Sequence, residues 1–289
     1  MTNVSAKTIQ DTVEELCVKA VEILPRDVLS ALQRAMEEEN NPLSKDILGV
    51  ILDNALLAAH EKIPICQDTG MTYVFVELGQ DVAIEDGYLY DAISQGVARA
   101  YVRGFLRKSV VSDPIFDRKN TGDNTPPVIH TEIVPGNEVK ITVMPKGTGS
   151  ENMSAVRMLA PGDGIEGVRR FVMEVVEKSG PNACPPLVVG VGIGGMMDKA
   201  AYLAKKALLR EIGSSNPDPR VAVLEKELVS AINGLGIGPG GLGGATTCLA
   251  VHIETYPTHI GALPVAVNLQ CHAARRASAV IRSEKRVLL

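Results

Sequence analysis

The feature that most restricts how this chain can fold is an exceptionally glycine-rich run at residues 234–244. Seven of its eleven residues are glycine. Glycine weakens helices and strands because it loses the most backbone freedom on folding, so the run predicts irregular structure. It separates two predicted helices, at 199–212 and 220–233, from two predicted strands, at 247–254 and 264–269.

Elsewhere the hydrophobic pattern alternates between helical and extended segments. Helices are predicted at residues 4–23, 26–39, 46–62 (with Ser44 as its N-cap), 86–108 and 164–179, with a final basic helix from His272 onward. Strands are predicted at 72–77 and 187–191, and a hairpin at 128–134 and 138–144, turned by Pro135, Gly136 and Asn137. The sequence therefore predicts a mixed α/β (α+β) fold: one helix-rich domain over residues 1–289 with small mixed or antiparallel sheets, arranged as two lobes around a cleft.

Composition narrows the functional class. The chain is 45% hydrophobic and 22% charged, as globular proteins are, and its formal net charge is −5. A mildly acidic chain with 3% aromatic residues and no Trp is not typical of nucleic-acid-binding proteins. The first twenty residues contain no apolar core of a signal peptide, and no stretch approaches 18 consecutive apolar residues. These features predict a cytoplasmic protein that binds neither membranes nor nucleic acids.

Residues 190–195 (GVGIGG) satisfy the GxGxxG pattern of dinucleotide-binding proteins. A Rossmann unit should alternate strands and helices from its glycines onward, but nearly two hundred helix-rich residues come first and no acidic second strand follows. The favoured interpretation is a strand-to-helix turn in which glycine permits close backbone approach. A third interpretation is that its backbone amides bind an anionic substrate.

The five cysteines differ in their surroundings. Cys66, Cys184 and Cys271 occupy predicted loops or element ends, where functional residues concentrate, whereas Cys17 falls inside a helix and Cys248 inside a strand. Their spacing does not match the compact motifs of zinc ribbons or ferredoxins. Each could be a small buried hydrophobic residue, and the scatter without a secretion signal suits free or metal-bound thiols.

Four segments carry distinctive motifs, and three of them contain one of these cysteines. The segments are 64–70 (PICQDTG), 145–152 (PKGTGSEN), 183–186 (ACPP) with 190–195, and 270–276 (QCHAARR). Together they resemble the motifs of the class I iron–sulfur fumarases and of the related L-tartrate dehydratases. The similarity extends from about residue 8 to 276 in the same order.

The resemblance implies a [4Fe–4S] cluster held by Cys66, Cys184 and Cys271. Three cysteines leave one iron open, and an open iron is a Lewis acid. The implied reaction is the hydration of fumarate to (S)-malate, a step of the tricarboxylic acid cycle. The alternative within the class is L-tartrate dehydration.

The same resemblance assigns site residues. Gln67, Asp68, Arg107 and Gly149 match substrate contacts, Asp68 could also exchange a proton, and His259 matches a catalytic histidine that reaches a neighbouring protomer. Ordinary roles remain open for each of the charged residues. Asp68 could cap the turn at Thr69, Arg107 could simply end a helix, and His259 could be a loop histidine.

The resemblance also implies partners. The chain matches the α subunit of the two-subunit form, so we expect a β subunit that carries the catalytic base, a second α subunit, and an α₂β₂ heterotetramer. The substrate is expected to be a small dicarboxylate. Two alternatives from other classes are a nucleotide-dependent oxidoreductase built on residues 190–195 and an iron–sulfur scaffold subunit without its own active site.

Overall fold

The computed structural model describes residues 2–282 and 285–289, and only the backbone of Lys285. The chain forms two compact units, each assembled from separate segments. The first unit comprises the chain up to residue 25, residues 55–147 and the chain from 275 onward, and the second comprises residues 26–54 and 148–274. Both are mixed α/β with small sheets, which confirms the predicted fold class. The single domain over 1–289 stays a prediction.

The first unit contains a five-stranded mixed sheet in the order β11-β10-β5-β2-β4. Strand β2 pairs in parallel with the edge strand β4 and antiparallel with the central strand β5, which pairs antiparallel with β10. A two-stranded parallel sheet, β1 with β3, lies in the same unit. The strands are β1 (Thr2–Ser5), β2 (Met71–Gly79), β3 (Val82–Glu85), β4 (Val128–Val134), β5 (Val139–Lys146), β10 (Ala277–Arg282) and β11 (Lys285–Leu288).

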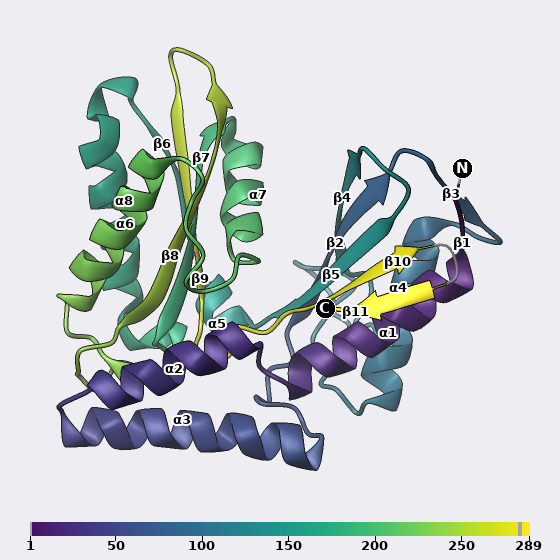
Figure 1. Cartoon of the computed structure of the whole chain (residues 1–289), viewed down its shortest axis with the longest axis horizontal. Coiled ribbons are helices and arrows are strands. Elements are labelled where there is room, and N and C mark those ends of the chain that lie inside the picture. Colours follow the sequence, from purple (N-terminus) through teal and green to yellow (C-terminus); the bar gives the residue numbers. More distant parts are fainter. Residues whose placement is uncertain (1, 283–284) are drawn as a thin grey trace. The chain divides into compact units, whose positions relative to one another are not determined.

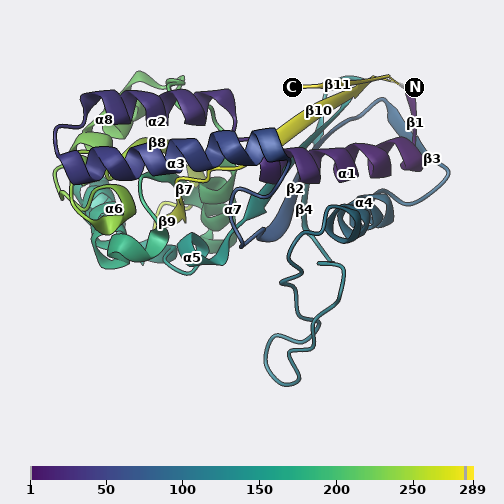
Figure 2. The same cartoon turned by 90° about the horizontal axis from the view of Figure 1, so that it is seen from below.

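Helix α1 (Ala6–Glu22) of this unit packs on β5 and β10, and helix α4 (Leu89–Arg103) packs against α1 (Figure 1). Ser5 caps α1, because its Oγ accepts a hydrogen bond from the Thr8 amide at 3.1 Å. Gly96 lets the helices approach closely, since a Cβ there would lie 2.6 Å from the Gln10 carbonyl oxygen. The segment between α4 and β4 extends away from the sheet of its own unit (Figure 2).

The second unit contains a four-stranded sheet in the order β6-β9-β7-β8. Central strand β7 pairs in parallel with β8 and antiparallel with β9. Helices α6 and α8 cover one face and α7 the other (Figure 1). The elements are α2 (Arg26–Glu38), α3 (Pro42–Glu61), α5 (Thr148–Glu151), β6 (Ala155–Leu159), η1 (Pro161–Asp163), α6 (Gly164–Ser179), η2 (Gly180–Ala183), β7 (Leu187–Gly195), α7 (Met197–Ala207), α8 (Pro219–Asn233), η3 (Pro239–Gly241), β8 (Cys248–Thr258) and β9 (Leu263–Gln270). Helix α3 is shared between the units, because its last part belongs to the first unit.

The GxGxxG glycines lie within β7 and face α7. A Cβ added at Gly190 would lie 2.2 Å from the Ala204 carbonyl oxygen, and one at Gly192 would lie 2.0 Å from that of Ala200. Val189 and Val191 point to the opposite face, into the core with α6 and α8. The glycines therefore allow helix α7 to pack directly on the strand backbone, which is the close approach that the sequence predicts.

Two predictions were wrong. The final segment is not helical, because Ala277, Ala279 and Ile281 alternate with more exposed residues and pair β10 with β5. The small and basic residues of this segment resemble a helical pattern, but pairing with β5 makes the segment extended. The predicted hairpin was also wrong, because β2 lies between β4 and β5 and pairs with both.

The start of α3 also differs from its predicted position. The helix begins at Pro42, and Asn41 rather than Ser44 caps it, with Oδ1 accepting from the Leu43 amide at 3.0 Å. Ser44 instead donates to the carbonyl oxygen of Gly243 at 2.7 Å. Proline suits the first helical position because its missing N–H needs no partner there.

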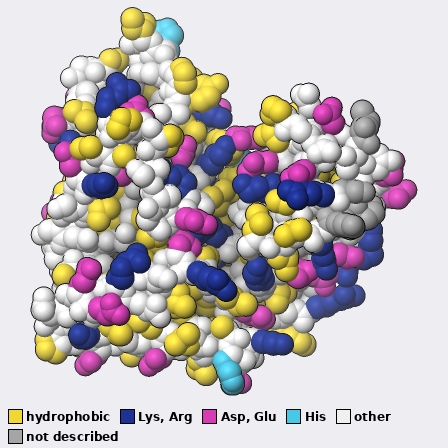
Figure 3. Space-filling view, in the orientation of Figure 1, with side chains coloured by type: hydrophobic (Ala, Val, Ile, Leu, Met, Phe, Trp, Pro, Cys, Tyr) yellow, Lys and Arg dark blue, Asp and Glu magenta, His cyan; other side chains and the backbone are white. Residues whose placement is uncertain are grey.

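Surface charges of both signs are mixed. Figure 3 shows Lys and Arg side chains interspersed with Asp and Glu over one face of the molecule. Within the described ranges, no helix has both the length and the apolar character that crossing a bilayer requires.

We expect Gly192→Ala to lower the free energy of unfolding by about 3 kcal/mol or more, because the added methyl overlaps the backbone of α7. Urea unfolding followed by circular dichroism measures the change. Gly162→Ala is the control, since a Cβ there meets nothing within 4 Å and should change stability by less than about 0.5 kcal/mol. Equal stability of the two variants would contradict the packing argument.

Candidate active site

The segment that carries Cys66 links α3 to β2 in the first unit. Its start is fixed by buried Ile65, whose amide donates to the carbonyl oxygen of Val21 at 2.9 Å. Cys66 is half-buried, and its Sγ lies 3.4 Å from Oε1 of the exposed Gln67. The thiol and the amide side chain therefore lie at the surface on an anchored loop.

Asp68 combines the two roles that the sequence left open. Its Oδ1 accepts a hydrogen bond from the Gly70 amide at 3.0 Å, so the carboxylate does stabilise the turn. Its Oδ2 lies toward Gly147, 3.3 Å from the position that a Cβ there would occupy. The turn thus fixes the carboxylate and directs its second oxygen toward a glycine of another predicted motif.

Arg107 is brought beside this loop through its backbone. Thr69 is buried, and its hydroxyl donates to the Arg107 carbonyl oxygen at 3.0 Å. Arg107 is exposed and follows α4 rather than ending it, since the helix ends at Arg103. Interaction with the helix dipole, which fades within the last turn, therefore does not explain the position of Arg107.

Two buried residues that sequence analysis missed hold the loop in place. The Tyr101 hydroxyl donates to the carbonyl oxygen of Thr69 at 2.7 Å, and burial raises the pKa of this hydroxyl. Asn124 donates to the Gly70 carbonyl oxygen at 3.1 Å and accepts from the Ser109 amide at 2.7 Å. Both come from segments distant in sequence, so no local pattern could have identified them.

Two cations are buried near the same loop. Lys146, at the end of β5, is 1% exposed, and its Nζ donates to the carbonyl oxygen of Gly147 at 3.3 Å. Arg275, just before β10, is 2% exposed, and its Nη2 lies 3.5 Å from the position of a Cβ on Gly147. Both belong to predicted motifs, but the sequence did not indicate that their charges are buried.

In the second unit, Cys184 and Cys271 lie on adjoining loops. Cys184 follows η2 with left-handed backbone angles (φ 54°, ψ 65°) and is exposed, and half-buried Cys271 follows β9. The His272 amide donates to the Cys184 carbonyl oxygen at 3.1 Å, which joins the two loops. Gly149 in α5 lies beside the same loop, because a Cβ there would lie 3.6 Å from the Asn182 carbonyl oxygen.

The glycine-rich run supports the Cys184 loop. The Gly240 amide donates to the carbonyl oxygen of Pro185 at 2.9 Å. A Cβ on Gly241 would lie only 2.1 Å from Cβ of Pro181, and the φ of Gly241 is +75°. A side chain at this position would therefore displace the loop that carries the cysteine, which explains why glycine is needed there.

A buried ion pair fixes α5. Lys205 of α7 is 6% exposed, and its Nζ lies 2.5 Å from Glu151 Oε1. Burial lowers the pKa of Lys205, and the adjacent carboxylate of Glu151 opposes that effect. Asn268 of β9 donates to Glu151 at 3.0 Å and to Ser154 at 3.1 Å. This network links α5 to the strand that leads to Cys271.

His259 lies in the turn between β8 and β9. It is exposed, and its Nδ1 accepts a hydrogen bond from the Gly261 amide at 3.1 Å. The adjacent Ile260 is 91% exposed. The predicted role of His259 in a neighbouring protomer stays a prediction.

Comparisons with known proteins show which family the chain belongs to. A model of the fumarate hydratase (fumerase) family matches residues 10–280. The chain is 44% identical over 273 residues to a Methanocaldococcus jannaschii protein provisionally named L(+)-tartrate dehydratase subunit alpha, a match covering 93% of this chain and 96% of that protein. It is 38% identical over 265 residues to the L(+)-tartrate dehydratase subunit alpha of Escherichia coli (strain K12), covering 90% and 86%. The chain belongs to the fumarate hydratase family. It is a hydro-lyase.

The cysteines of this fumarate hydratase family member also divide by exposure. Cys17 and Cys248 are fully buried, and burial raises the pKa of the Cys248 thiol to about 12 and that of Cys17 as well. Cys66, Cys184 and Cys271 are half-buried or exposed and form no disulfide. Because metal ligands are thiolates, these three fit an iron–sulfur cluster and the buried two do not.

A site for a single metal ion differs from a cluster site in how its ligands are grouped. Within residues 2–282 and 285–289, no three His, Cys, Asp or Glu side chains are grouped closely enough to hold one metal ion. In an iron–sulfur cluster the thiolates bind different iron atoms, so the ligands do not converge on one point.

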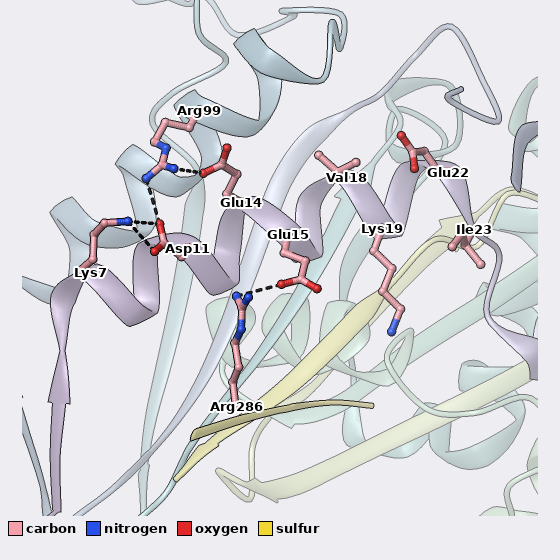
Figure 4. Close-up of a pocket in the computed structure, with 10 residues that line it drawn as sticks. All are labelled: Lys7, Asp11, Glu14, Glu15, Val18, Lys19, Glu22, Ile23, Arg99 and Arg286. Atoms are coloured by element: carbon pink, nitrogen blue, oxygen red, sulfur yellow. Dashed lines mark hydrogen bonds and ion pairs between the residues drawn. The ribbon is translucent and has the colours of Figure 1, made fainter. Parts of the chain in front are cut away.

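An open pocket on the surface of α1 has a structural explanation. Arg99 pairs with Asp11 at 3.0 Å and with Glu14 at 2.6 Å, and Arg286 pairs with Glu15 at 2.9 Å (Figure 4). Most of the charges that line the pocket thus pair with one another, tying α1 to α4 and β11. None of these residues belongs to the predicted motifs.

We expect a thiol reagent such as DTNB at pH 8 to modify Cys66, Cys184 and Cys271 rapidly in the folded, metal-free protein. At a pKa of about 12, only about one Cys248 in 10⁴ is a thiolate at that pH, and the side chain is also inaccessible. Mass spectrometry after short exposure locates the modified residues. In urea all five should react, and equal protection of Cys184 and Cys248 in the folded protein would contradict the division.

Proposed function

We propose that this chain is the α subunit of a class I fumarate hydratase that interconverts fumarate and (S)-malate. The observation that carries the proposal is the grouping of motif residues within each unit. Asp68 and the Arg107 backbone lie beside one loop, and Gly149, Cys184 and Cys271 lie around another. Family membership over residues 10–280 supports the same chemistry.

L-Tartrate dehydration is the second candidate, favoured by the names of the two relatives described above. Malate and tartrate are both 2-hydroxydicarboxylates that lose water between adjacent carbons. They differ by one hydroxyl, so the same carboxylate-binding cations and the same proton-transfer groups would serve either. The substrate must therefore be assigned by assay.

Cys66, Cys184 and Cys271 would hold the [4Fe–4S] cluster. When bound, such a cluster supplies a Lewis acid for the carbon–oxygen bond that breaks. The protein must contribute the remaining tasks, which are to bind the carboxylates, orient the hydroxyl and move a proton.

The chain's own residues suit these tasks. The guanidinium of Arg107 can donate two parallel N–H bonds to one substrate carboxylate. The Gly149 amide lies in the first turn of α5, where amides lack an acceptor within the helix, so it can donate to substrate. Asp68, held by the Gly70 amide, presents its second oxygen for exchange of a proton, and the exposed Gln67 can hydrogen-bond beside it.

Completion of the site by a β subunit is part of the proposal. The relatives are named as alpha subunits, which supports a β partner that carries the base. We propose an α₂β₂ heterotetramer in which His259 extends toward the second α subunit. The exposed turn that carries His259 and Ile260 suits such a contact.

Two alternatives are less well supported. A nucleotide-dependent oxidoreductase would use residues 190–195, but the backbone of α7 fills the space beside Gly190 and Gly192. A scaffold subunit would need none of Gln67, Asp68 and Arg107 near its cysteines. A broad absorbance shoulder in the blue after reconstitution with iron and sulfide would favour a cluster protein over a nucleotide enzyme.

We expect replacement of Cys66, Cys184 or Cys271 by Ser to abolish cluster absorbance and activity after anaerobic reconstitution, because each removes one of three anchors. Cys17→Ser and Cys248→Ser are the controls and should retain the cluster, with a loss of about 1 kcal/mol in stability. Iron content and the visible spectrum measure the effect. Full absorbance in Cys184→Ser would overturn the ligand assignment.

We expect the reconstituted α chain alone to be at least ~10²-fold slower than the αβ complex, because a general base typically contributes that much or more. Titrating β subunit into α, with malate and L-tartrate assayed in parallel, measures the effect and identifies the substrate. Full activity without the β subunit would overturn the proposal that the β subunit carries the catalytic base. An αβ complex that turns over neither substrate would overturn the proposed function.

A further inference from the structure

Glu39 is a buried carboxylate that accepts hydrogen bonds from four backbone amides. It lies between α2 and α3 and is 4% exposed. Its Oε1 accepts from the amides of Asn40 and Asn41, both at 3.0 Å, and its Oε2 accepts from Ala245 at 2.7 Å. The Thr246 amide donates a fourth hydrogen bond to the same carboxylate. Glu39 thus joins the α2–α3 junction to the chain that directly follows the glycine-rich run.

The carboxylate of Glu39 is ionised at neutral pH. Burial raises its pKa, but the hydrogen bonds from the backbone amides outweigh this effect and lower the pKa of Glu39 below its usual value. Hydrogen bonds to an ionised acceptor are roughly twice as strong as those between neutral groups. Because the donors are all main-chain N–H groups, the charge of Glu39 fixes the path of the backbone in both segments that it joins.

Ser44 adds a second contact between the same two segments. Ser44 is fully buried, and its Oγ donates to the carbonyl oxygen of Gly243 at 2.7 Å. Gly244 lies beside both contacts, since a Cβ there would lie 2.5 Å from Oγ of Ser44 and 2.8 Å from Oε2 of Glu39. Two buried side chains of the α2–α3 junction therefore fix the end of the glycine-rich run.

The glycine-rich run is folded on itself, which couples its end to its middle. The Gly243 amide donates to the carbonyl oxygen of Ile237 at 2.9 Å, and the Gly241 amide donates to that of Gly238 at 3.0 Å. The Gly238 amide in turn donates to Oγ1 of Thr247 at 3.1 Å. Because these bonds close the run into one loop, a displacement of its end should also displace its middle.

The middle of the run supports Cys184 on both sides. The Gly240 amide donates to the carbonyl oxygen of Pro185 at 2.9 Å, and Gly241 lies against Pro181, whose carbonyl oxygen accepts from the Cys184 amide at 3.0 Å. The φ of Cys184 is 54°, a left-handed conformation that residues other than glycine rarely adopt. Such a conformation persists only where the surrounding contacts maintain it, and the run supplies contacts of that kind.

We propose that Glu39 is a positioning residue for Cys184, acting through the glycine-rich run to fix the backbone of this ligand of the proposed iron–sulfur cluster. A ligand that is already held loses little conformational freedom when a metal binds, so the support strengthens binding. The inference rests on the proposed function for the identity of the bound group. The link from Glu39 to Cys184 does not, and it lies entirely within the second unit.

The test compares the full-length wild-type chain with Glu39→Ala, Glu39→Gln and Ser44→Ala. Glu39→Gln keeps the shape of the side chain and one acceptor oxygen, and Ser44→Ala removes the second contact without changing a charge. Glu225→Gln is the matched control. Glu225 is likewise a buried glutamate of the second unit that accepts from a backbone amide, that of Ile253 at 2.8 Å, but it pairs with Arg210 and lies outside the link.

Two measurements separate the link from its consequence. Hydrogen–deuterium exchange of the metal-free chain, followed by mass spectrometry, measures how often the Gly240 and Cys184 amides open, and the amides of β7 report unfolding of the core. After anaerobic reconstitution with iron and sulfide, the rate at which an iron chelator removes the visible absorbance measures how firmly the cluster is held.

We expect Glu39→Ala to speed exchange at Gly240 and Cys184, relative to β7, and to speed cluster loss, each by at least ~10-fold, because residues that support metal ligands typically contribute about 10- to 100-fold to affinity. Glu39→Gln should be intermediate, since its remaining oxygen still accepts from part of the backbone. Ser44→Ala should change both rates less but in the same direction. Glu225→Gln should leave both ratios at the wild-type value.

Wild-type exchange at Gly240 and Cys184 in folded Glu39→Ala would overturn the link, and so would equal opening in Glu225→Gln. If Glu39→Ala does not fold, Glu39→Gln and Ser44→Ala decide by the same comparison. Faster exchange with unchanged cluster loss would overturn the role of Glu39 in cluster binding. A wild-type protein that builds no cluster would instead refute the proposed function, and the metal-free exchange rates would still decide the link.

Discussion

The second unit depends on the direct packing of α7 against the backbone of β7. Gly190 and Gly192 leave no side chains between strand and helix, so Ala200 and Ala204 contact the strand itself. This contact places Lys205, whose ammonium group pairs with Glu151 and so fixes α5. Asn268 joins the same carboxylate to the strand that ends before Cys271. Glycine packing thus positions the elements that carry Gly149 and Cys271.

Backbone hydrogen bonds position the motif loops in both units. The cysteine loops of the second unit are joined by the His272 amide and the Cys184 carbonyl, and the glycine-rich run supports them through Gly240. In the first unit, Tyr101 and Asn124 hold the Cys66 loop through its carbonyl groups. Since these supports act on the main chain, the side chains of the motif residues are left for chemistry, as expected of a fumarate hydratase family member.

Part of the candidate site could be predicted from local sequence. The loop positions of Cys66, Cys184 and Cys271 follow from the prolines, glycines and polar residues around them, and the structure confirms that these thiols are more exposed than Cys17 and Cys248. Burial of Lys146 and Arg275 could not be predicted, because it depends on which distant segments cover them. The final strand β10 was missed for the same reason, since pairing with β5 outweighs a weak local preference.

The sequence by itself determined the fold class, the family and the sorting of the cysteines, because hydrophobic periodicity, turn residues and motifs are local properties of the chain. Only the tertiary structure decided that β2 inserts between β4 and β5, that the glycines of β7 face a helix, and that Arg275 is buried beside Asp68 and Gly147. These features arise from contacts between residues far apart in sequence, whose free energies no local pattern records.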